Sequence, residues 1–102
     1  MKLIETLSEK ISEEICDAKS YAELAIENRE AYPDLAQTLY ELSVEEMGHM
    51  SRLHMAVAGI IEQYRKEKGE PPAAMLAVYD YLHKRQTEKA AEAKAMQELF
   101  KG

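Results

Sequence analysis

Glu46 and His49 are the side chains whose types and spacing point most directly to chemistry. In a helix, residues three positions apart project from the same side about one turn apart, so a carboxylate and an imidazole can reach one ion together. Glu14 is the third candidate, because it interrupts an otherwise apolar heptad row that contains Leu7 and Tyr21. Oxygen and imidazole donors without a thiolate suit iron, manganese or zinc. We therefore predict metal ligation by Glu14, Glu46 and His49, with no catalytic residue beyond the ligands.

The heights of these three residues along their helices give a second argument for the metal site. In an antiparallel hairpin that turns near Tyr32, Glu14 lies about as far before the turn as residue 50 lies after it. At a rise of about 1.5 Å per residue, Glu46 and His49 then lie within roughly one turn of Glu14. Each unpaired carboxylate or imidazole that is buried in an apolar bundle loses roughly several kcal/mol of hydration free energy. A divalent cation would offset that cost.

Asp80 and His83 repeat the carboxylate and histidine spacing and are the additional ligand candidates. Folding about Gly69 sets His83 opposite residue 55, about 10 Å from the level of His49 by the helical rise. His83 is therefore expected to approach His54, and packing or an interface is the better interpretation of both histidines.

Two clusters of helix-stopping residues divide the chain, one around Pro33 and one at residues 68–72. They predict helices at about residues 2–31, 33–67 and 71–100. The expected fold is a single all-α domain, an antiparallel up-down-up bundle of three helices. The apolar stripe of the third helix is weak, which predicts either loose packing or burial against a second copy of the chain.

Heptad rows predict which faces of the first two helices are buried. On the first helix, one row is apolar throughout: Ile4, Ile11, Ala18 and Ala25. On the second helix, the rows that contain Glu46 and His49 are expected to face inward, with a second apolar edge beside them: Met47, Met50, Val57, Ile61 and Tyr64.

The composition excludes several classes of protein. A net charge of -6 disfavours nonspecific attraction to nucleic acid or to an anionic membrane surface. Cys16 is the single cysteine, so the chain cannot form an internal disulfide, a rubredoxin-type iron centre or a zinc ribbon. No segment approaches the ~20 apolar residues of a membrane span. We expect a cytoplasmic protein with neither nucleic acid nor membrane as a partner.

Residues 11–54 resemble the ferritin-like di-iron superfamily, in particular its rubrerythrin-type branch. The resemblance lies in an inward Glu14 followed by Tyr21, the turn at Tyr32 and Pro33, and the stretch Glu45-Glu46-Met47-Gly48-His49. It implies a di-iron site that oxidises Fe(II) with oxygen or peroxide, as a ferroxidase or a peroxidase. Without a rubredoxin module, the electrons would come from bound iron or from an external donor. The chain offers only one full ligand set where the family's site needs two. The resemblance to short encapsulated ferritins implies that a second chain completes the site in a homodimer or a larger homo-oligomer.

Two other interpretations remain open at the level of sequence. The chain can be a metal-free helical adaptor whose polar inner residues specify register or partner, as buried polar groups do in some coiled coils. The same ligands can also hold zinc or manganese structurally, without turnover.

Overall fold

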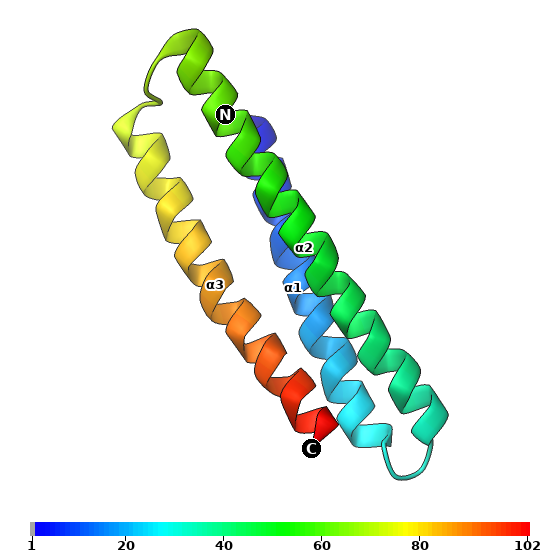
Figure 1. Cartoon of the computed structure of the whole chain (residues 1–102). Coiled ribbons are helices and arrows are strands. Elements are labelled where there is room, and N and C mark those ends of the chain that lie inside the picture. The colour runs from blue at the N-terminus through cyan, green and yellow to red at the C-terminus, as the bar shows by residue number, and fades with distance from the viewer. Residues whose placement is uncertain (1) are drawn as a thin grey trace.

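The computed structural model describes residues 2–102 and consists of three long helices. They are α1 (Lys2–Asn28), α2 (Pro33–Lys68) and α3 (Ala73–Lys101). The described residues contain no strand, so the prediction of an all-helical bundle is confirmed. The helices lie along one another in a rod of 56 × 19 × 18 Å (Figure 1). None of the three helices, over residues 2–102, is long and apolar enough to cross a membrane.

Two helix ends differ from the predicted bounds by two residues or more, and a proline follows or precedes each within five residues. The first helix ends at Asn28 and not at residue 31, and residues 29–31 form a turn that leads to Tyr32, which has a φ of -137 and a ψ of 70 before Pro33. The third helix begins at Ala73 and not at residue 71, because Pro72 has a ψ of 139 and stands outside the helix as its N-cap. Gly69 ends α2 with a φ of 84, a conformation that glycine adopts without a steric cost.

The packing of α1 against α2 forms most of the core. All four residues of the predicted apolar row of α1 are buried, and three of them are Ile4, Ile11 and Ala18. Contacts between the two helices pair Ala18 with Ser43 and Glu14 with His49, so residue numbers rise along one helix as they fall along the other.

On α2, the edge predicted as secondary is the one that packs most deeply. Met47 and Val57 of that edge are buried, and Met50 is half-buried against the core. The row of His49 is the outer one, since His49 and Ala56 are exposed. The prediction that this row faces inward is therefore wrong, because the contact with α1 is centred on the Met47 edge.

The third helix attaches to the other two through polar side chains as well as apolar ones. The Gln86 amide donates hydrogen bonds to the Ser8 carbonyl at 3.1 Å and to its hydroxyl at 3.0 Å. Further along, the Gln97 amide donates to the buried Ser43 hydroxyl at 2.8 Å, and that hydroxyl donates to the Ala18 carbonyl. Only Ala93 of α3 is buried, in keeping with the weak apolar stripe of its sequence.

Candidate metal centre

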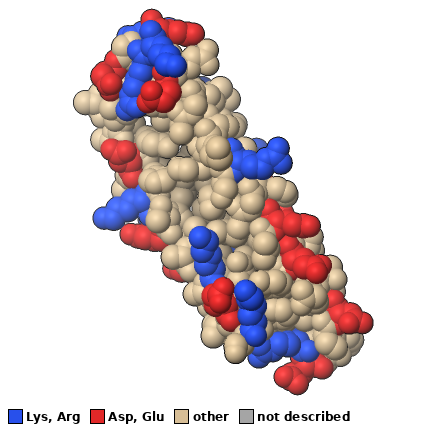
Figure 2. Space-filling view, viewed as in Figure 1, with Lys and Arg blue, Asp and Glu red and all other residues tan. Residues whose placement is uncertain are grey.

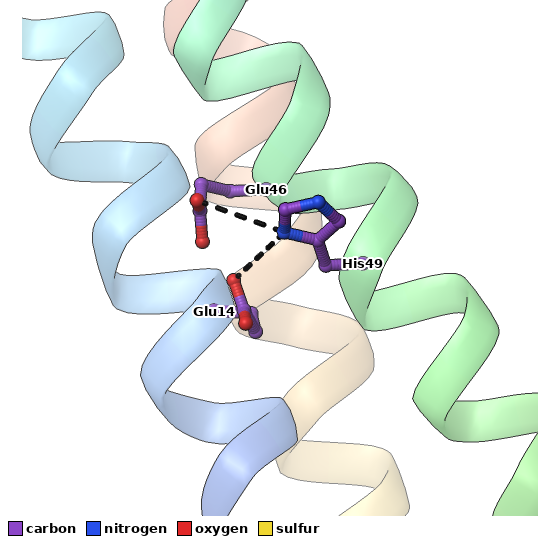
Figure 3. A group of neighbouring side chains, drawn as sticks. All are labelled: Glu14, Glu46 and His49. Carbon is purple, nitrogen blue, oxygen red and sulfur yellow. Dashed lines mark ion pairs between the residues drawn. The ribbon is translucent and has the colours of Figure 1, made fainter.

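Glu14 of α1 and the pair Glu46 and His49 of α2 converge on one point between the two helices (Figure 3). One donor atom from each residue lies within 4.8 Å of the donor atoms of the other two. Glu46 and His49 lie on one side of α2 because they are three residues apart in a regular helix. The packing of α1 against α2 brings Glu14 to the same height.

The distances in this cluster are longer than hydrogen bonds and close to the distances between ligands of one ion. His49 Nδ1 lies 3.6 Å from Glu14 Oε2 and 3.7 Å from Glu46 Oε1. Both distances exceed the range of a good hydrogen bond, which ends near 3.2 Å. Donors bound to one ion at about 2.1 Å lie about 3.0 Å apart at a right angle and about 3.4 Å apart at the tetrahedral angle. A small movement of the side chains would therefore suffice to coordinate a cation.

One carboxylate oxygen of the cluster is buried and has no hydrogen-bond partner, namely Glu14 Oε2. The Glu14 and Glu46 side chains are 26% and 18% exposed, so each carboxylate is largely withdrawn from water. A withdrawn oxygen without a partner is costly and is rare in folded proteins. A metal ion would supply the missing partner, so the residues present fit the metal that the sequence predicts.

His49 departs from the predicted burial, because its side chain is 54% exposed. A pocket of about 380 Å³ opens beside it and is lined by Glu14, His49, Arg52 and Leu53. In Figure 3, α3 lies behind both ligand-bearing helices, so the cluster opens on the side of the hairpin that α3 leaves uncovered. The site is thus at an edge of the bundle and not in its centre.

Arg52 is a neighbour of the site that the sequence did not single out. The spacing in the sequence could have indicated it, because Arg52 follows His49 by about one helical turn and so lies on the same side of α2. Arg52 lines the same pocket as the Glu14 carboxylate.

The structure does not bring Asp80 or His83 to the cluster. As predicted, the His83 ring approaches His54, and the two rings stack with their centroids 4.5 Å apart and an interplanar angle of 16°. Burial, and then the charge of His83, lower the pKa of His54. Asp80 lines a separate pocket with Arg65 and Tyr79, where burial, and then Asp80, raise the pKa of the Tyr79 hydroxyl.

Within residues 2–102, the cluster of Glu14, Glu46 and His49 is the one group of three or more acidic, histidine or cysteine side chains close enough to share an ion. The described part of the chain therefore holds a single candidate set of ligands. Comparison of the chain with protein-family models, with curated proteins and with solved structures finds no match.

Proposed function

We propose that this chain is a ferritin-like, antiparallel helical bundle that binds iron through Glu14, Glu46 and His49 and oxidises Fe(II) with oxygen or a peroxide. The observation that carries the proposal is the convergence of three donor atoms within 4.8 Å, one of them a buried oxygen without a hydrogen-bond partner. Structural residues rarely leave a carboxylate in that condition.

In this proposal each ligand has a distinct part. Glu14 and Glu46 neutralise the cation and are suited to bridging two metals, as carboxylates do in di-iron bundles. His49 supplies a neutral nitrogen through Nδ1, the atom that faces both carboxylates. Iron is the substrate and gives up one electron per ion, so two Fe(II) ions match the reduction of one peroxide to water. The protein orients the ions, and the protons come from solvent.

We further propose that a second copy of the chain covers the open side and completes a two-metal site. The α2 row that contains Glu46 is half-buried along its length, with Leu39, Leu53 and Ile60 in it. Leu35, one turn before Leu39, is 48% exposed. Burial of such apolar surface stabilises a complex by about 25 cal/mol per Å². This contact between two copies of the chain would cover His49. It would also place the ligand residues of the two chains opposite each other.

Anaerobic titration with Fe(II) tests the metal site. The wild-type protein is expected to bind about one equivalent per chain, since two chains share a two-metal site, and to develop the near-ultraviolet absorption of oxidised iron when air is admitted. Glu46→Ala should abolish both, whereas Glu45→Ala, which removes the exposed neighbouring carboxylate, should leave both unchanged. Equal, weak uptake by all three proteins would instead support the metal-free adaptor.

Sedimentation in the presence of the metal tests the interface. The wild-type chain is expected to form a dimer that Leu35→Glu weakens, because a charge would then be buried in the contact. Val78→Glu is the matched control, since Val78 lies on α3 and is 56% exposed. A monomer at every concentration, with metal bound, would contradict the shared site and leave the metal site itself intact.

A further inference from the structure

A groove of about 450 Å³ runs between α2 and α3, apart from the metal cluster, and shares no lining residue with the pocket at His49. Its apolar lining includes Ile11, Met50, Met55 and Ala90. This volume falls in the range of pockets that hold small molecules, about 300 to 1,000 Å³, which are mostly apolar with a few polar groups. The groove arises because α3 packs mainly on α1 and leaves the adjoining side of α2 open.

The charge of the groove differs from the charge of the chain. The chain has 19 acidic and 13 basic residues, yet the groove is lined by no carboxylate. Its one charged lining residue is Lys94, which forms no ion pair within residues 2–102. Figure 2, which views this side of the molecule, shows an uncharged middle between α3 and α2, with charged side chains mainly toward the edges and ends. A positive group beside an apolar surface is complementary to a ligand that is apolar and carries one negative charge.

The histidines and the amide of the groove add hydrogen-bonding groups. His54 and His83 line it side by side, and burial, followed by the charge of His83, lowers the pKa of His54. Gln86 lines it as well, although its amide already donates to the Ser8 hydroxyl. Lys94 is therefore the lining residue that we expect to bind a charged group of the ligand.

We propose that the groove between α2 and α3 binds a free amphiphilic carboxylate, with its apolar body against Ile11, Met50 and Met55 and its carboxylate at Lys94. The lining carries this inference: apolar side chains, no competing carboxylate and one unpaired ammonium group. This proposed site does not involve the metal cluster, so an experiment can contradict one of the two proposals without affecting the other.

Calorimetric titration with decanoate, kept below its micelle concentration, tests the proposal. Saturable binding of one molecule per chain is expected. Lys94→Glu should weaken it by about tenfold or more, as expected for loss of one charge-assisted contact. Lys84→Glu makes the same change of net charge on an exposed part of α3 outside the groove, and it should leave the affinity within about twofold. Decanol, which lacks the charge, should bind about tenfold more weakly than decanoate.

A second pair of variants tests the location. Ala91 is exposed and lines the groove, so Ala91→Trp should fill it and block decanoate. Ala95, one turn further along α3, is exposed but lies outside the lining, and Ala95→Trp should have no effect. Absence of saturable binding, or equal affinity in the Lys94→Glu and wild-type proteins, overturns the proposal. If a dimer that Ala91→Trp prevents is found instead, a second copy of the chain occupies the groove.

Discussion

Replacement of Glu14 by glutamine should stabilise the metal-free protein while it abolishes metal binding. Glu14 Oε2 is buried without a hydrogen-bond partner, and the carboxylate shares its surroundings with Glu46. An amide of nearly the same shape removes one of two neighbouring negative charges. It can also donate a hydrogen bond to Glu46 or to His49 Nδ1.

The size of the effect follows from the burial. A buried polar group without a partner costs about 1 to 3 kcal/mol, and the 26% exposure of the Glu14 side chain favours the low end of that range. We expect Glu14→Gln to raise the free energy of unfolding by about 1 kcal/mol, which for a domain of this size raises Tm by about 4 to 8 °C. A metal at roughly one hundred times its Kd should stabilise the wild-type protein by about 2.7 kcal/mol. The Glu14→Gln protein should not gain this stability when the metal is added.

Thermal unfolding followed by far-ultraviolet circular dichroism measures both effects, first with a chelator and then with Mn(II). Glu23→Gln is the matched control, because Glu23 is an exposed carboxylate of the same helix, and it should change neither value. If the metal-free Glu14→Gln protein is less stable than the wild type, the buried carboxylate is satisfied and our argument from the missing partner fails. A full metal-dependent shift in the variant would show that Glu14 is not a ligand.

Three further predictions concern the fold. Ser43→Ala should lower the free energy of unfolding, measured in urea, by about 1 to 2 kcal/mol, because it removes the acceptor of the Gln97 amide from the core. Ser20→Ala, at an exposed position, should change that free energy little. Gly69→Ala should cost about 1 to 2 kcal/mol, since its φ is 84, and an unchanged midpoint would show that the turn relaxes. The lowered pKa of folded His54 means that the unfolded chain binds more protons, so stability should fall as pH drops below about 6.5. His54→Phe should reduce that fall between pH 7.5 and 5.0, and an identical pH profile would contradict the assignment to His54.

The sequence predicted the parts of this fold that depend on local pattern. The three helices follow from the apolar periodicity and from the prolines that interrupt it, and the height of His83 opposite His54 follows from the helical rise alone. The two misplaced helix ends lie in the connections that contain Pro33 and Pro72, where no apolar periodicity indicates the last helical residue.

The burial of the candidate site was harder to predict, because a heptad row shows which side chains share a face but not which neighbour covers it. The row of Glu46 and the edge of Met47 are both apolar, and Met47 is the buried one because it packs against Ala18 of α1 and Ala93 of α3. A weak stripe on α3 could not indicate that side. His49 therefore lies at an open edge, although its sequence neighbourhood is that of a buried residue.

Anomalous diffraction from crystals grown with Mn(II) or with anaerobic Fe(II) would test the metal site most directly. We predict an anomalous peak bounded by Glu14, Glu46 and His49, with a second peak about 3.5 to 4 Å away that belongs to the ligand set of a second chain. An anomalous map with no peak between these three side chains, in crystals that hold the metal elsewhere, would contradict the account.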